Sequence, residues 1–116
     1  EKITFNAMDE ALLKRAMAIV EKNMDNIEFS TDEFAREMNM SRSNLHLKLK
    51  AITGESTIDF IRKIRFNEAA KLLKDGRYTV AEVSTMVGFN TPSYFATSFK
   101  KYFGCLPTEY IKKSKG

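Results

Sequence analysis

The scarcity of cysteine and histidine limits the chemistry that this sequence can support. Its 116 residues include one cysteine, Cys105, and one histidine, His46. A lone cysteine excludes an internal disulfide, and a lone histidine leaves no cluster of nitrogen and sulfur ligands for a structural zinc. There is also no paired carboxylate and histidine set, no glycine-rich phosphate loop and no activated nucleophile around Cys105. We therefore expect neither an enzyme nor a bound metal or cofactor.

Long apolar runs are missing too. No window of about 18 apolar residues could cross a bilayer, so we expect no membrane contact. The opening residues EKITFNAMDE lack the apolar run of a secretory signal, which favours the cytoplasm, and residues 1–8 read as a linker or disordered terminus. The chain starts with Glu rather than Met, which fits either a fragment of a longer protein or a processed chain.

Acidic residues are absent from two stretches, residues 38–54 and residues 83–108. The net charge of +4 is modest, but the second part of the chain, from residue 51, holds eleven Lys and Arg against six Asp and Glu. A single charge run is usually a solvated face. Two such stretches in matching positions favour a surface that meets nucleic acid phosphates.

Helical spacing dominates the rest of the chain, so the predicted fold class is all-α. An amphipathic helix is expected from Asp9, and a capping box over residues 30–33 opens a short second helix. Asn39 suits a left-handed turn, after which Ser41 caps a helix that ends at Gly54. We assign one domain over residues 9–113: a first helix-turn-helix at 30–54, a linker helix at 56–75, a second helix-turn-helix at 79–104 and a closing helix at 107–113.

The second helix-turn-helix is a divergent copy of the first. A shift of 49 positions aligns Ser30, Glu33, Phe34, Met38, Asn39 and Met40 with Thr79, Glu82, Val83, Val87, Gly88 and Phe89. After one inserted residue the shift is 50, which aligns Leu45, Leu49, Lys50 and Gly54 with Phe95, Phe99, Lys100 and Gly104. Caps, turn residues and core spacing agree together, which indicates one motif present twice.

The second helix of the second copy, up to Gly104, has one apolar and one polar face, as expected of a helix that binds in a DNA groove. Asn90 or Thr91 is expected to cap it, with Pro92 in its first turn. Phe95, Phe99 and Tyr102 follow at i, i+4 and i+7 and predict a buried aromatic face that Phe103 widens. The opposite face is small, polar and basic.

In a helix-turn-helix, the second helix lies in the major groove. The residues predicted to face base pairs are Ser43, His46, Leu47, Ser93, Tyr94 and Thr97. The residues predicted to contact phosphates are Arg42, Lys50, Lys100 and Lys101. His46 could donate to guanine and Leu47 could touch a thymine methyl, whereas the lysines and Arg42 would add affinity without sequence information.

Each of these assignments has a plainer alternative. His46 could be an exposed histidine without a role, and Leu47 could be covered by another helix. Ser93 and Thr97 could be short side chains in solvent. Arg62 and Arg65, on the long helix, are expected to form ion pairs with Glu68 or another acid. As a whole, the chain could instead be a helical protein-interaction module, with Leu47 and Tyr94 in a patch that faces the partner.

The chain resembles the DNA-binding domain of the AraC/XylS family of bacterial transcription regulators, from Ser30 to Tyr110. Three segments carry the resemblance in order: SRSNLHLKLKAITG, FIRKIRFNEAAKLL and GFNTPSYFATSFKKYFG. The resemblance implies seven helices, with two helix-turn-helix units joined by a long helix and facing successive major grooves of double-stranded DNA.

Two departures from the family bear on function. The family often has Arg where Leu47 stands and a polar or basic residue where Thr97 stands, which leaves the base preference open. Leu106 replaces the Ser or Thr that usually precedes the proline, which affects a helix cap. Domains of this family are commonly fused to a ligand-binding or phosphorylation-controlled module. We therefore expect an upstream sensory or receiver domain, as in two-component regulators, and dimerisation through regions outside this segment.

Overall fold

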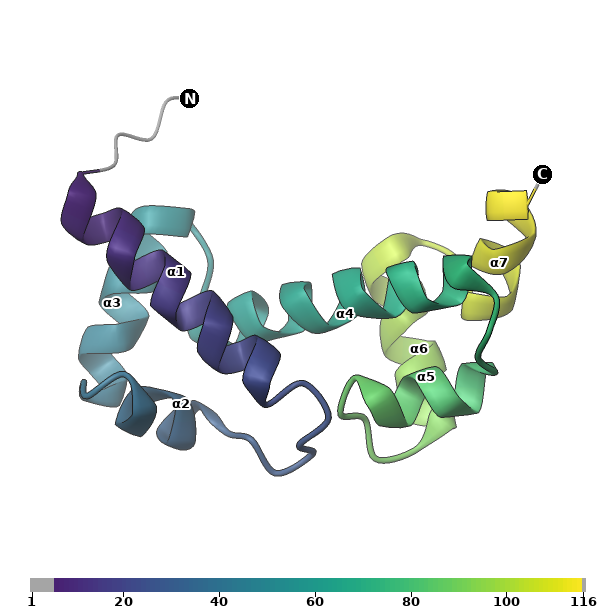
Figure 1. Cartoon of the computed structure of the whole chain (residues 1–116), viewed down its shortest axis with the longest axis horizontal. Coiled ribbons are helices and arrows are strands. Elements are labelled where there is room, and N and C mark those ends of the chain that lie inside the picture. The colour runs from purple at the N-terminus through teal and green to yellow at the C-terminus, as the bar shows by residue number, and fades with distance from the viewer. Residues whose placement is uncertain (1–5, 116) are drawn as a thin grey trace. The chain divides into compact units, whose positions relative to one another are not determined.

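The computed structural model describes residues 6–115, and these form seven helices and no strand. The helices are α1 (Ala7–Lys22), α2 (Thr31–Glu37), α3 (Arg42–Thr53), α4 (Thr57–Asp75), α5 (Val80–Met86), α6 (Pro92–Phe103) and α7 (Pro107–Lys115) (Figure 1). The predicted all-α class is confirmed. None of the described helices is both long and apolar enough to span a membrane.

The chain divides into two compact units. Unit 1 contains residues 6–23 and 28–64, and unit 2 contains residues 24–27 and those from Arg65 onward. The long helix α4 supplies its first part to unit 1 and its second part to unit 2. Residues 24–27, in the connection between α1 and α2, also belong to unit 2, although both of the helices that the connection joins lie in unit 1.

The starts of the helices follow the predicted caps. The side-chain oxygens of Ser41 and Thr91 each accept a hydrogen bond, of 3.1 Å, from the backbone N–H three residues later. Thr79 does the same at 3.1 Å and completes its capping box, because the carboxylate of Glu82 accepts the Thr79 N–H at 2.8 Å. These bonds satisfy donors that a helix leaves unpaired at its first turn.

Two predicted starts need correction. Ser30 caps α2 at 3.2 Å, but the reciprocal half of its box is absent among the described contacts, since the Glu33 carboxylate pairs with Arg36 at 2.6 Å. Helix α1 begins at Ala7 rather than at Asp9, because Asn6 accepts from the Asp9 N–H at 2.8 Å. Of the predicted linker, residues 1–5 lie outside the described part of the chain.

Helix α7 begins directly after Leu106, which stands where the AraC/XylS family usually has Ser or Thr. The Leu106 N–H donates to the carboxylate of Glu109 at 2.8 Å. This is the reciprocal half of a capping box, which does not depend on the side chain at residue 106, whereas a Ser or Thr there would also accept an N–H of the first turn.

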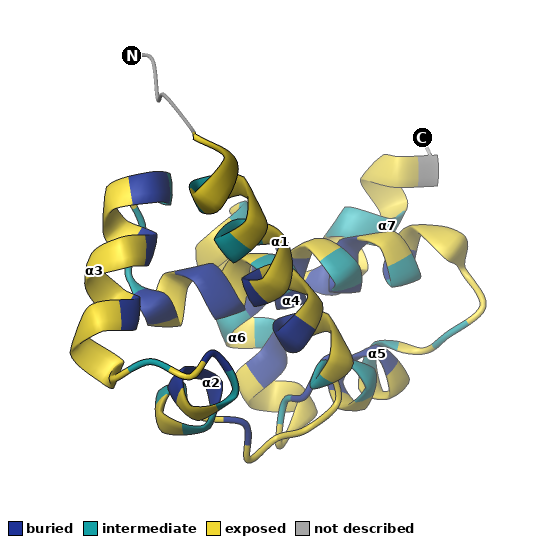
Figure 2. Cartoon of the chain, turned by 60° about the vertical axis from the view of Figure 1, so that its left-hand side comes forward, coloured by how far each residue is buried: buried dark blue, intermediate teal, exposed yellow. Residues whose placement is uncertain are grey.

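Unit 1 has a mainly aliphatic core. Val20, Phe34, Leu45 and Leu49 are almost completely buried within it, and Phe34 stacks on Phe60 with ring centroids 6.1 Å apart. Each such side chain contributes about 1.5–3 kcal/mol when it leaves water. In Figure 2, α3 shows this burial as a dark stripe on one side and an exposed face on the other.

Unit 2 has an aromatic core. Phe95 and Phe99 are fully buried, and their ring centroids lie 5.6 Å apart. Phe66 of α4 and Tyr110 of α7 pack edge-on against Phe99, at 6.3 and 5.5 Å. Tyr102, predicted to be buried, stacks on Phe66 at 4.9 Å but remains 44% exposed. The buried aromatic face of α6 is therefore narrower than its i, i+4, i+7 spacing predicts.

Candidate nucleic-acid interface

Each unit contains a helix-turn-helix with a left-handed residue at the turn. The backbone φ is 58° at Asn39, in the turn between α2 and α3, and 83° at Gly88, in the turn between α5 and α6. The N–H of Met40 reaches back to the carbonyl of Ala35 at 3.0 Å, and that of Phe89 makes the equivalent bond at 2.9 Å. Glycine adopts positive φ freely and asparagine tolerates it, so both predicted turns are confirmed.

We call α3 and α6 the reader helices, because each presents an exposed face opposite its core face. On α3, Leu45, Leu49 and Ile52 face the core. The exposed side chains include Ser43, His46, Leu47 and Lys50. Leu47 is 64% exposed, so it is not packed beneath another described helix.

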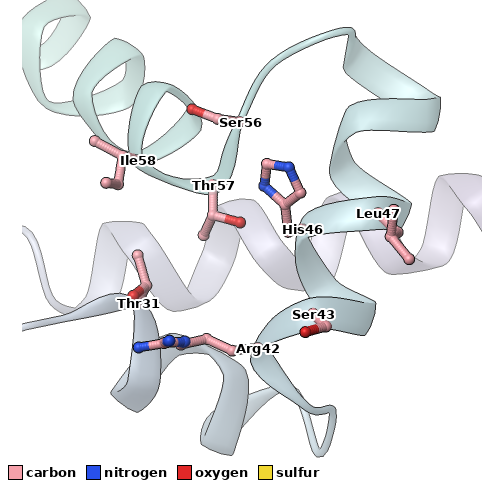
Figure 3. Close-up of a pocket in the computed structure, with 8 residues that line it drawn as sticks. All are labelled: Thr31, Arg42, Ser43, His46, Leu47, Ser56, Thr57 and Ile58. Carbon is pink, nitrogen blue, oxygen red and sulfur yellow. The ribbon is translucent and has the colours of Figure 1, made fainter.

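A hollow of about 490 Å³ lies beside the exposed face of α3, entirely within unit 1 (Figure 3). Its lining consists of Thr31 from α2, the start of α4 and four predicted interface residues. The lining residues are Thr31, Arg42, Ser43, His46, Leu47, Ser56, Thr57 and Ile58. The structure thus places Arg42 beside the three base-facing predictions of the first unit, whereas Lys50, also predicted to contact phosphates, is not among the lining residues.

Arg42, predicted to contact a phosphate, has an acidic partner within unit 1. Its guanidinium donates to the carboxylate of Asp32 on α2 at 3.1 Å, and both side chains are largely exposed. Exposed ion pairs of this kind contribute about 0–1 kcal/mol, so a phosphate could replace Asp32 at little cost.

On α6, the predicted residues are also exposed, but one of them is already engaged. Ser93, Tyr94 and Thr97 lie on the open face, and Lys100 and Lys101 follow on the last turns. The Thr97 hydroxyl donates to the Ser93 carbonyl at 3.0 Å. Its proton is therefore used within the helix, and toward solvent Thr97 offers only a methyl group and oxygen lone pairs.

Arg65 of α4, expected to form an ion pair with Glu68 or another acid, donates to backbone carbonyls. Its side chain is buried, at 8% exposure, and it donates to the backbone carbonyl of Asn26 at 2.9 Å and to that of Gly88 at 3.4 Å. Burial lowers the pKa of Arg65, and the charge of Asp25 opposes this shift. Its place four residues after buried Ile61 and four before buried Ala69 was the available signal, because this spacing puts it on the covered side of α4.

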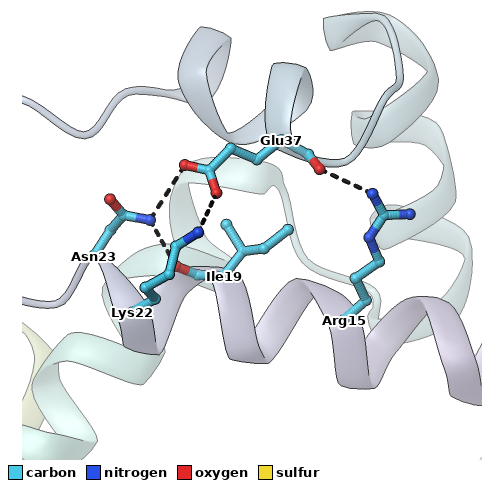
Figure 4. Close-up of polar contacts among 5 residues, drawn as sticks. All are labelled: Arg15, Ile19, Lys22, Asn23 and Glu37. Atoms are coloured by element: carbon cyan, nitrogen blue, oxygen red, sulfur yellow. Dashed lines mark hydrogen bonds and ion pairs between the residues drawn. The ribbon is translucent and has the colours of Figure 1, made fainter.

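An arginine also anchors the turn region of unit 1, but at the surface. Arg15 of α1 donates to the Glu37 carbonyl, the last residue of α2, at 2.9 Å (Figure 4). The Glu37 carboxylate accepts from Lys22 at 2.9 Å and from Asn23 at 3.4 Å. The hydrogen bond from Lys22 is the main reason that the pKa of Glu37 is lowered from its ordinary value of 4.5.

Comparison with known proteins identifies a family. A family model described as a helix-turn-helix domain matches residues 34–113. The Histidine kinase P4 of Formosa agariphila is 40% identical over 109 residues, which cover 94% of this chain and 8% of that protein. The HTH-type transcriptional regulator MtrA of Neisseria gonorrhoeae is 32% identical over 102 residues, covering 86% of this chain and 34% of that protein. The chain therefore spans about a third or less of these curated relatives.

Solved structures share the fold. The C-terminal domain of AraT, a response regulator from Geobacillus stearothermophilus, superposes with a TM-score of 0.81 at 30% identity, over 88% of this chain and 84% of that one. A transcriptional regulator from Chromobacterium violaceum, described as containing an AraC-type DNA-binding domain, superposes with a TM-score of 0.82 at 24% identity. That match covers 94% of this chain and 96% of that one.

Proposed function

The chain belongs to the helix-turn-helix family of AraC-type transcription regulators, and from this premise we propose that it binds a specific DNA sequence with both reader helices. Helices α3 and α6 would enter successive major grooves, about 34 Å or one helical turn apart. The observation that carries the proposal is the duplicated motif: two copies with matching caps and turns, each ending in a helix with an exposed, acid-free basic face.

The roles of the side chains follow from their chemistry. The exposed residues Ser43, His46, Leu47, Ser93, Tyr94 and Thr97 are proposed to face base pairs, whereas Arg42, Lys50, Lys100 and Lys101 are proposed to contact phosphates. Arg42 would exchange Asp32 for a phosphate on binding. Small side chains such as Ser93 let the backbone of α6 approach the groove floor.

The test is a footprint on DNA selected from a random pool by the chain itself. Two protected segments one turn apart are expected, with affinity that falls steeply as salt rises. Reversing two phosphate contacts with Lys100→Glu and Lys101→Glu should reduce the salt slope by about 0.9 for each contact that is lost. Binding that is indifferent to salt and to both reversals would overturn the proposal.

The wider protein is proposed to be a two-component or otherwise signal-controlled regulator. The support is that one relative is a histidine kinase and that one structural neighbour is the C-terminal domain of a response regulator. In this proposal an upstream sensory or receiver domain controls the segment, dimerisation uses regions outside it, and it works in the cytoplasm without catalytic activity of its own. Phosphorylation of the longer protein should then change its affinity for the selected DNA.

One observation favours a second function, a protein-interaction surface. Leu47, Ile58 and Tyr94 are large apolar side chains that are each more than half exposed. The double variant Ser43→Glu plus Thr97→Glu separates the two readings, because it places negative charge on both reader helices. Loss of DNA binding is expected. DNA binding that survives this change would favour the interaction module instead.

A further inference from the structure

A buried arginine ties together three parts of unit 2. Arg65 extends from α4, and its Nη2 atom donates to the carbonyl of Asn26 at 2.9 Å, in the connection between α1 and α2. Its Nη1 atom reaches the carbonyl of Gly88, in the turn between α5 and α6, at 3.4 Å. Both acceptors are backbone carbonyls, so a substitution of Arg65 removes both bonds and leaves both acceptors in place.

The turn fits closely against both the arginine and the connection. A Cβ atom placed on Gly88 would lie 2.6 Å from the carbonyl oxygen of Met24 and 2.9 Å from Cζ of Arg65. Both distances are shorter than real Cβ contacts allow. Asp25, in the same connection, adds a favourable charge for the guanidinium. Thus α4, the connection and the turn leave no free space at this point.

We infer that Arg65 is a positioning residue for the second reader helix. Gly88 lies three residues before Thr91, the cap of α6, so the location of its carbonyl influences the direction in which α6 leaves the turn. Groove recognition needs side chains held to within about 0.5 Å of their productive geometry. Arg65 itself is too buried to touch DNA. The inference rests on the proposed role of α6 as a reader.

The experiment compares footprints of the chain and its variants on the selected DNA. Arg65→Met should lose the segment protected by α6 and keep the one protected by α3. Affinity should fall about 100-fold, the scale at which linked binding modules lose their mutual reinforcement. Arg65→Lys keeps the charge but reaches one carbonyl at most, so partial recovery of the second segment is expected.

Two further variants make the test specific. Lys71→Met removes the same charge from an exposed position of α4 and should preserve both protected segments. Gly88→Ala displaces the arginine without altering it and should reproduce the Arg65→Met footprint. All variants are assayed below their unfolding temperatures, measured by circular dichroism.

The outcomes separate the two hypotheses. If folded Arg65→Met and Gly88→Ala chains keep both protected segments at unchanged affinity, the positioning role is wrong. If the unaltered chain protects fewer than two segments, the proposed function fails instead.

Discussion

The two reader helices carry the same residue types near their ends and different residue types at their centres. A shift of 50 aligns Ser43 with Ser93 near the start of each helix and Lys50 with Lys100 near the end, and all four side chains are exposed. Between them, His46 and Leu47 of α3 correspond to Ala96 and Thr97 of α6. In the proposed binding mode, the common positions would hold each helix on its DNA, and the central pair would determine which bases it favours. The two copies of the motif therefore agree at the serine and the lysine near the helix ends and differ at the central pair.

The contacts that stabilise the two helix-turn-helix units differ as well. Arg15 anchors unit 1 from an exposed position, whereas Arg65 anchors unit 2 from a buried one. The unit 1 core is mainly aliphatic and the unit 2 core is aromatic. The same helix-turn-helix motif is thus stabilised by an aliphatic core in unit 1 and by an aromatic core in unit 2. Substitutions at equivalent positions of the two units test how far the two copies behave alike.

The largest expected effect is in the cores. Phe99→Ala in unit 2 should lower the free energy of unfolding by about 3–5 kcal/mol and the equivalent Leu49→Ala in unit 1 by about 2–5 kcal/mol. Both side chains are fully buried, but Phe99 also makes ring contacts with four aromatic neighbours. Urea unfolding of both variants provides the measurement. A smaller loss for Phe99→Ala than for Leu49→Ala would contradict the stronger role given to the aromatic core.

The second largest effect on stability is expected at the left-handed turn residues of the two units. Gly88→Ala should cost about 1–2 kcal/mol from the left-handed backbone alone, plus the displacement of Arg65 and of the Met24 carbonyl. Asn39→Gly at the corresponding turn should change the stability by less than about 1 kcal/mol, because glycine accepts the same φ. Thermal unfolding compares the two. A cost for Gly88→Ala no greater than the backbone strain of about 1–2 kcal/mol would show that the close packing around Gly88 contributes nothing.

The third comparison transfers the two central residues of α6 to the equivalent positions of α3. His46→Ala with Leu47→Thr gives α3 the central pair of α6, and should remove about 1–3 kcal/mol of discrimination at each base pair that these side chains read. Binding to operators with single base changes measures the loss. The matched control, Ala51→Ser, alters an exposed residue of α3 outside the proposed interface and should leave the base preferences as they were. Unchanged preferences in the exchanged helix would remove His46 and Leu47 from the list of base-facing residues.

The smallest effect concerns one buried hydroxyl. Ser84 of α5 is 1% exposed, and its Oγ has no hydrogen-bond partner in the described part of the chain. The equivalent residue in α2 is Ala35, which is also buried. Ser84→Ala should therefore stabilise the chain by about 1 kcal/mol, and Ala35→Ser should destabilise it by a similar amount. Urea midpoints at constant slope would show both, and a destabilising Ser84→Ala would mean that the hydroxyl has a favourable role.

Much of the candidate site could be predicted because its signals are local. The caps at Ser41 and Thr91 and the turns at Asn39 and Gly88 depend on contacts within a few residues, so residue type and spacing suffice. Exposure of the base-facing residues follows from the same helical spacing once the core face is known. The sequence does not indicate that Arg42 pairs with Asp32, since each has several competing partners.

The sequence by itself determined that the chain is helical, that one helix-turn-helix occurs twice, and which face of each reader helix is apolar. These properties arise from backbone preferences and periodicity, which act along the chain. Only the tertiary structure decided that Tyr102 stays half exposed and that Arg65 is buried against the turn at Gly88. Each outcome depends on which groups distant in sequence are brought together, and on the cost of leaving a buried polar group without a partner.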